Sequence, residues 1–194
     1  FISFCKGSIN SLPWCEIPLA IESNKILNDL VSLNKAGYLT INSQPKVNGL
    51  PSEDPNFGWG AKGGRVFQKT YLEFFTSKDK LDRLIKILDT LNDISYQAVS
   101  TNGDIISNLS EESVNAVTWG VFPGQEILQP TIVDTRSFLI WKDEAFGLWI
   151  NDWASIYKQK SDSYNLLHQI HDSYYLVNIV DNDFINGDMI KHIL

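Results

Sequence analysis

The chain has 194 residues, of which 43% are hydrophobic and 12% aromatic, enough to bury the core of one large domain or two small ones. Its formal net charge of -7 disfavours nucleic acids and anionic membrane surfaces as partners, because both select clustered Lys and Arg. The longest apolar stretches, such as residues 137–141, are far shorter than the roughly 20 residues that span a bilayer, and no signal-peptide pattern opens the chain, so no membrane association is expected.

The N-terminal third is predicted to contain a helix, a strand and a long loop. Over residues 22–36 apolar side chains recur at helical spacing, and Gly37 follows where a left-handed cap would end the helix. Residues 38–43 alternate as a strand does, and Gln44-Pro45 ends it. The segment 46–64 contains two prolines and five glycines, too many for regular structure, so a loop is expected there.

The middle of the chain is predicted to return repeatedly to strand. Residues 65–75 are rich in aromatic side chains and favour a single strand, and a helix with a leucine-rich stripe begins at Ser77. Strands over 96–100 and 105–107 flank Asn102-Gly103, a pair typical of hairpin turns, and residues 116–122 favour another strand.

In the C-terminal third, residues 131–133 favour a short strand, 138–157 a long amphipathic helix with three tryptophans, and 164–171 a further helix. The strand predicted over 175–180 is apolar without alternation, which indicates a central place in its sheet. Helices and strands alternate irregularly around a hairpin. We therefore predict a mixed α/β (α+β) domain covering residues 1–194 rather than a doubly wound sheet.

The residues Gly58 to Gly63 read G-x-G-x-x-G, the pattern with which a backbone approaches a dinucleotide pyrophosphate. Such a turn lies between a strand and a helix, whereas here a proline-rich loop precedes the pattern and a predicted strand follows it. Lys62 is also not followed by Ser or Thr, as a phosphate loop requires. A structural glycine loop is the better interpretation.

Neither a metal site nor a catalytic site is predicted. His168 and His171 share a helix face, but no H-E-x-x-H motif supplies further ligands, and Asp181-Asn182-Asp183 lacks the glycine and distant glutamate of a calcium loop, so we interpret it as a solvated turn. There is no G-x-S-x-G elbow. Cys5 and Cys15 are expected to be free thiols in a reducing cytoplasm, with a disulfide between them as the alternative.

Six polar residues remain at the ends of predicted strands and helices: Glu22, Ser23, Thr40, Ser43, Thr118 and Thr131. Each alone can be a helix cap, an edge position or a turn residue. The sequence pattern by itself does not gather them into one site.

Several longer strings carry a family resemblance, at residues 12–14, 39–45, 58–60, 66–69, 71–77, 115–120, 141–146 and 176–184. In this order, and over nearly the whole chain, they closely resemble the C-terminal regulatory half of eukaryotic methylenetetrahydrofolate reductases. The chain begins at Phe1 in sequence that reads as the middle of a protein, so we expect the natural protein to extend upstream.

The resemblance implies that a (β/α)8 catalytic barrel with FAD, NADPH and the folate precedes this domain through a linker. This domain would carry no cofactor or catalytic residue of its own. It would bind S-adenosylmethionine as an allosteric inhibitor, with S-adenosylhomocysteine competing for the site, and would contribute to a homodimer. The implied fold is two mixed sheets side by side with helices around them.

By the same resemblance, Glu22, Ser23, Thr40, Ser43, Thr118 and Thr131 are the ligand contacts. The Glu22 carboxylate could pair with the cationic groups of S-adenosylmethionine, while hydroxyls and a helix N-terminus could hydrogen-bond its carboxylate. Ser23 stands where relatives commonly have Thr.

Two other functions are alternatives. A ligand-insensitive domain kept for dimerisation and stability would have these six residues filled in by side chains rather than converging on an open pocket. An autonomous methyltransferase would need a glycine-rich strand-to-helix turn, which the sequence lacks.

Overall fold

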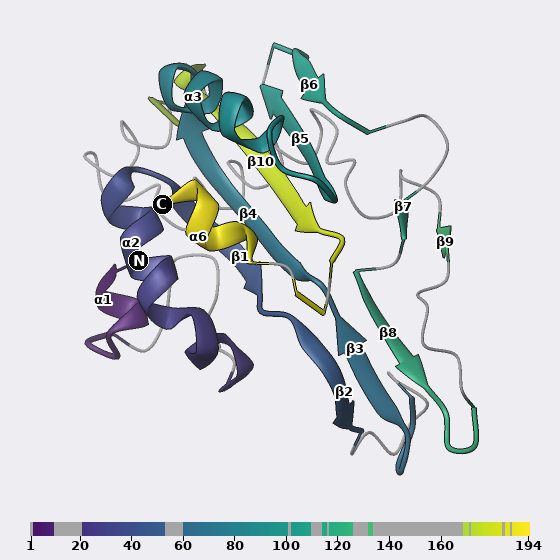
Figure 1. The fold of residues 1–194 in the computed structure, drawn as a ribbon. Coiled ribbons are helices and arrows are strands. Elements are labelled where there is room, and N and C mark those ends of the chain that lie inside the picture. Colours follow the sequence, from purple (N-terminus) through teal and green to yellow (C-terminus); the bar gives the residue numbers. More distant parts are fainter. Residues whose placement is uncertain are drawn as a thin grey trace.

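A computed structural model describes residues 2–9, 21–52, 60–100, 102–109, 114–115, 117–125, 132–133, 169–170, 172–183, 185–186 and 188–194. Figure 1 shows the arrangement of its elements. In chain order they are α1 (Ile2–Cys5), the 3-10 helix η1 (Ile21–Ile26), α2 (Leu27–Ala36), β1 (Leu39–Gln44), β2 (Val47–Pro51), β3 (Arg65–Gln68), β4 (Thr70–Ser77), α3 (Lys78–Leu88), β5 (Ile94–Ser100), β6 (Ile105–Ser107), β7 (Val114–Asn115), β8 (Thr118–Val121), β9 (Ile132–Val133), β10 (Tyr174–Asp181) and α6 (Met189–Ile193).

The strands form a five-stranded sheet of order β1-β4-β10-β5-β6, a three-stranded sheet of order β2-β3-β8, and the pair β7-β9. The predicted α+β class without a doubly wound sheet is confirmed. The sheets were expected to be mixed, but every pairing among the described strands is antiparallel. The reason lies at β10: α3 carries the chain from β4 to β5, which run in the same direction, and β10 lies between them and pairs antiparallel with both.

The strand predicted over residues 65–75 is two strands. Lys69 separates β3, in the three-stranded sheet, from β4, in the five-stranded sheet. In Figure 1, β1 likewise leads directly into β2, so two neighbouring segments cross together from one sheet to the other. The prediction of a single strand is wrong because aromatic residues favour an extended backbone but do not indicate which sheet that backbone joins.

The loop predicted over residues 46–64 was wrong at its start, where β2 forms. Glycine and proline both disfavour a strand, yet β2 contains one of each. Gly49, at φ 72°, sits where the register shifts between Asn48 and Leu50, a bulge that suits glycine. Pro51 is the last residue of the strand, where its missing N–H costs no interior pairing.

The main core lies on one face of the five-stranded sheet. Leucines of α2 and α3 and the apolar residues of α6 pack on alternate residues of β4, β10 and β5, among them Leu72, Phe74, Val177 and Ile179, all without exposed surface. The central place predicted for β10 is confirmed. In the smaller sheet, Phe67 stacks on Trp119 with ring centroids 5.5 Å apart.

Most predicted local elements are confirmed. Gly37 caps α2 with a left-handed φ of 94°, and α3 begins directly after Ser77. At the hairpin turn, Gly103 has φ 83° and its N–H donates to the carbonyl of Ser100 at 3.1 Å. The predicted first helix is α-helical only from Leu27, since residues 21–26 form a 3-10 helix.

Several predictions lie outside the described residues. They include the helix over 138–157, Cys15, Thr131, His168 and His171. Of the helix predicted over 164–171, residues 169 and 170 are described and are helical. No helix among the described residues has the length and apolarity to cross a bilayer.

The described end of the G-x-G-x-x-G segment is a structural turn, as predicted. Gly60 and Gly63 have φ of 93° and 86°, and the strand β3 follows at Arg65 where a dinucleotide site would have a helix. Gly64 is packed still more tightly. A Cβ there would lie 2.0 Å from the carbonyl oxygen of Gly60 and 2.4 Å from that of Val121, both rigid backbone atoms.

We therefore expect Gly64→Ala to lower the free energy of unfolding by about 3 kcal/mol, the upper end for overpacking, because neither carbonyl can move away. Urea denaturation measures the change. Gly124→Ala is the matched control: it also replaces a turn glycine, at φ +80°, but its Cβ would meet nothing within 4 Å, so about 1 kcal/mol is expected. Equal costs for both variants would contradict the tight packing at Gly64.

Candidate functional site

The edge strand β1 is where the predicted site residues meet. Thr40 and Ser43 lie on β1 itself, η1 with Glu22 and Ser23 lies against it, and Thr118 at the start of β8 reaches it through Gln44. The short helix η1 and the start of β8, which are far apart in sequence, therefore both meet β1. Thr131 and the side chain of Glu22 lie outside the described structure.

A bulge in β1 brings Thr40 and Ser43 to the same face. On a regular strand, residues three apart point to opposite faces. Here the register shifts between Thr40 and Asn42, so Thr40 pairs with Phe74 and Ser43 with Leu72, both on the helix-covered face. The sequence gives no sign of this bulge, which only the pairing with β4 reveals.

The Thr40 hydroxyl is enclosed and already bonded. Its residue has no exposed surface, and Asn34 of α2 donates from Nδ2 to Thr40 Oγ1 at 2.7 Å. The same amide accepts from the backbone N–H of Thr40 at 3.3 Å and donates to the carbonyl of Leu30 at 2.8 Å. No pattern in the sequence singles out Asn34, because an amide on a helix usually faces solvent.

On the opposite side of β1, Thr118 is half-buried and bonds to the side chain of Gln44. Thr118 Oγ1 donates to Gln44 Oε1 at 2.9 Å. Gln44 Nε2 donates to the carbonyls of Lys69 at 3.0 Å and Val117 at 3.4 Å. Gln44 therefore joins β1 to the crossing segment at Lys69 and to Val117, the residue directly before β8.

The predicted residues differ in accessibility. Ser23 is 2% exposed and Thr40 is fully buried, whereas Ser43 and Thr118 are half-buried. A ligand could therefore reach Ser43 and Thr118 in the arrangement described, but contact with Ser23 or Thr40 requires movement of the covering segments. Their assignment as ligand contacts stays a prediction.

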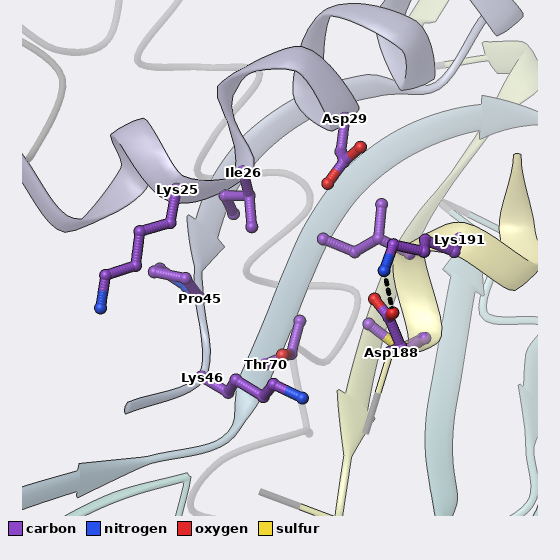
Figure 2. A pocket seen from close by; sticks show the side chains of 10 residues that line it. Lys25, Ile26, Asp29, Pro45, Lys46, Thr70, Asp188 and Lys191 are labelled. Carbon is purple, nitrogen blue, oxygen red and sulfur yellow. Dashed lines mark hydrogen bonds and ion pairs between the residues drawn. The ribbon is translucent and has the colours of Figure 1, made fainter. Parts of the chain in front are cut away.

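A cavity of about 290 Å³ opens beside this strand, between η1, the β1–β2 turn and α6 (Figure 2). Its lining is Lys25, Ile26, Asp29, Pro45, Lys46, Thr70, Asp188, Met189, Ile190 and Lys191, so apolar side chains are flanked by charges of both signs. Lys191 and Asp188 form an ion pair across one wall, drawn dashed in Figure 2. Of the predicted residues whose side chains the structure describes, Ser23, Thr40, Ser43 and Thr118 do not line it, although Lys25 and Ile26 belong to the same short helix as Ser23.

A second gathering of polar groups crosses the other face of the five-stranded sheet. Cross-strand pairing places Asn42, Glu73, Asn178, Gln97 and Ser107 in one row over all five strands. Tyr71 donates its hydroxyl to Asn178 Oδ1 at 2.6 Å. Both Glu73 oxygens, Gln97 Oε1 and Asn178 Nδ2 are buried without a hydrogen bond of normal geometry.

Burial controls the titration of Glu73. The residue has no exposed surface, and desolvation raises its pKa from 4.5 to about 7, while the side chain of Asn42, its neighbour on β1, lowers the pKa only in part. The sequence did not single out Glu73, since a lone Glu within an apolar strand carries no motif.

The acidic turn after β10 is structural rather than a solvated turn. Asp181 is 3% exposed and accepts from the backbone N–H groups of Met189 and Asp183, both at 3.1 Å. Asp183 Oδ1 accepts from the N–H groups of Ile185 and Asn186. Within the described part of the chain no three His, Cys, Asp or Glu side chains gather as a metal site would require.

The chain is similar to known proteins over nearly its whole length. Residues 5–194 match the family model described as "MTHFR, SAM-binding regulatory domain". A maize protein named methylenetetrahydrofolate reductase (NADH) 1 is 50% identical over 190 residues, covering 97% of this chain and 32% of the relative. Methylenetetrahydrofolate reductase 2 of Saccharomyces cerevisiae is 46% identical over 190 residues (96% and 32%), and a probable methylenetetrahydrofolate reductase (NADPH) of Caenorhabditis elegans 42% over 191 (96% and 29%). The chain thus spans about a third of the length of these relatives.

The raised pKa of Glu73 gives stability a pH dependence of known sign. The folded-state pKa of about 7 lies above the unfolded value of 4.5. The stability that the neutral Glu73 carboxyl gives the folded protein is therefore complete below pH 4.5 and is lost as the pH rises through 7. At pH 8 the charged form costs about 3 kcal/mol. Glu73→Gln is expected to raise the free energy of unfolding at pH 8 and to flatten its decline between pH 5 and 8.

Urea denaturation across this pH range measures both effects. Asp79→Asn, a charge removal at an exposed position in the first turn of α3, is the matched control and should leave the decline in place. A Glu73→Gln variant that is less stable than the parent at pH 8 would show that the buried carboxylate has a stabilising partner.

Proposed function

The chain belongs to the SAM-binding regulatory-domain family of methylenetetrahydrofolate reductases, and from that premise we propose that it binds S-adenosylmethionine and thereby regulates a reductase. The observation that carries the proposal is the match over residues 5–194 together with the meeting of the predicted contacts at β1. S-adenosylhomocysteine is proposed to compete for the same site.

The chemistry of the β1 region suits this ligand. S-adenosylmethionine carries a sulfonium, an α-ammonium, an α-carboxylate and an adenine. In the proposal, the Glu22 carboxylate pairs with the cationic groups of the ligand. The hydroxyls of Ser23, Thr40 and Ser43 donate hydrogen bonds to the ligand's α-carboxylate. Thr118 and Thr131 complete the site.

Regulation requires a second state. A ligand shifts an equilibrium only through its different affinity for two states, so the linker to the catalytic domain is proposed to dock differently in the bound and free forms. The catalytic domain is proposed to be a (β/α)8 barrel that reduces 5,10-methylenetetrahydrofolate with FAD and NADPH. The worm relative is named for NADPH and the maize relative for NADH, so the choice of nicotinamide is part of the proposal. A cytoplasmic homodimer is proposed as the assembly.

One observation favours a second candidate, a domain kept for dimerisation and stability without ligand sensitivity. Ser23 and Thr40 are buried, and the Thr40 hydroxyl already bonds to Asn34. In a domain that had lost its ligand, side chains would fill the site in this manner. The two candidates differ in whether these residues become accessible when the effector is present.

Calorimetric titration of S-adenosylmethionine into the full-length polypeptide separates the candidates. We expect saturable binding that Glu22→Ala weakens at least about tenfold, the loss of one charge-assisted contact. Asn24→Ala, an exposed neighbour on the same 3-10 helix, is the matched control and should bind as the parent does. No binding by the parent, with a dimer retained in sedimentation, would favour the stability domain.

A further inference from the structure

Two unpaired charges of opposite sign line the cavity beside η1. Lys25 on η1 and Asp29 on α2 both line it, and neither makes a hydrogen bond or an ion pair with any described residue. On a regular α-helix, residues four apart share a face and opposite charges can pair. Here the 3-10 helix ends at Ile26, whose φ of -115° and ψ of 14° are not helical. Ile26 therefore lies between the two charged side chains (Figure 2).

The rest of the lining suits a small molecule. Ile26 and Pro45 contribute apolar surface from the N-terminal third of the chain, and Met189 and Ile190 contribute it from α6. Ligand sites are typically concave and mostly apolar, with a few polar groups that fix the orientation of the ligand. The volume of about 290 Å³ has room for about ten non-hydrogen atoms, at the roughly 30 Å³ that a water molecule occupies in the liquid.

The other charged groups of the lining have partners within the protein. Lys191 forms its ion pair with Asp188, so this pair adds no net charge to the cavity. Lys46, on the β1–β2 turn, donates to the carbonyl of Ile185 at 3.4 Å. The two unpaired charges on η1 and α2 are therefore the groups left to bind a ligand.

We infer that this cavity binds a small zwitterion with an apolar carbon body, such as an amino acid, whose ammonium pairs with Asp29 and whose carboxylate pairs with Lys25. The apolar body lies on Ile26, between the two charges. Such a ligand gives each charge the partner that the helix boundary denies it, and it covers apolar surface. Asp29 repels a purely anionic ligand, and Lys25 repels a purely cationic one. The site is separate from the predicted effector contacts, so the inference does not depend on the proposed function.

Equilibrium dialysis of two labelled probes against the full-length polypeptide tests the site. L-leucine carries both charges on one carbon atom, whereas 6-aminohexanoate carries them at the two ends of an apolar chain, so the probes distinguish the two kinds of zwitterion. We expect saturable binding of at least one probe. Its N-acetyl derivative has no ammonium group and should bind at least about tenfold more weakly, the loss of one charge-assisted contact.

Asp29→Asn and Lys25→Gln should each weaken binding of the probe at least about tenfold. Asp29→Asn should leave the affinity for the N-acetyl derivative unchanged, because that derivative has no ammonium to pair with Asp29. A merely structural role of Asp29 would lower both affinities. Lys35→Gln is the matched control: it removes an exposed charge in the last turn of α2, outside the lining, and should bind as the parent does. Urea denaturation verifies that each variant folds.

The outcomes separate this inference from the proposed function. A parent that binds neither probe would overturn the inference, and so would an Asp29→Asn variant that weakens the probe and its N-acetyl derivative equally. An Asp29→Asn variant that also loses affinity for S-adenosylmethionine would overturn it too, because the cavity would then belong to the effector site. A parent that binds a probe but not S-adenosylmethionine would overturn the proposed function and leave this inference standing.

Discussion

Two neighbouring chain segments leave the five-stranded sheet for the three-stranded sheet at the same place, and the amide of Gln44 ties them together there. One segment crosses at Pro45 and the other at Lys69. Gln44 bonds to the carbonyl of Lys69, and the N–H of Lys69 donates to the carbonyl of Val117 at 2.8 Å. Because β8 begins at the next residue, this junction sets where Thr118 lies relative to β1.

The side chain of Lys69 anchors the same junction to Asn182, directly after β10, and through it to the start of β5. It is 1% exposed, and its Nζ donates to Asn182 Oδ1 at 2.8 Å, while Asn182 Nδ2 donates to Ser95 Oγ at 2.7 Å. Burial lowers the pKa of Lys69 to about 8, against the opposing effect of Asp181. Burying an ammonium group costs free energy unless its hydrogen bonds are made. The hydrogen bond to Asn182 therefore restricts where Lys69, and with it the crossing between the sheets, can lie.

The two faces of the large sheet have different roles. The helix-covered face holds the apolar core, and the bulge in β1 turns Thr40 and Ser43 toward it. The other face carries the polar row centred on Glu73 and Asn178, where burial is costly and unmatched polar atoms persist. Stability thus comes mainly from the face with the helices. Of the residues assigned to ligand binding, Thr40 and Ser43 lie on the edge strand β1, and Thr118 bonds to the end of that strand through Gln44.

Local elements could be predicted from the sequence alone: the periodicity of α2 and α3, the cap at Gly37, the turn at Asn102-Gly103 and the buried strand β10 all follow from residues close together in the chain. The sequence also carried the resemblance from which the six site residues were named. It could not predict the break at Lys69, the strand β2 or the bulge in β1, because each depends on pairing with a strand distant in sequence. The roles of Asn34, Gln44 and Glu73 were likewise decided only in the tertiary structure, since the hydrogen-bond direction of an amide and the pKa of a carboxylate are set by the atoms packed around them.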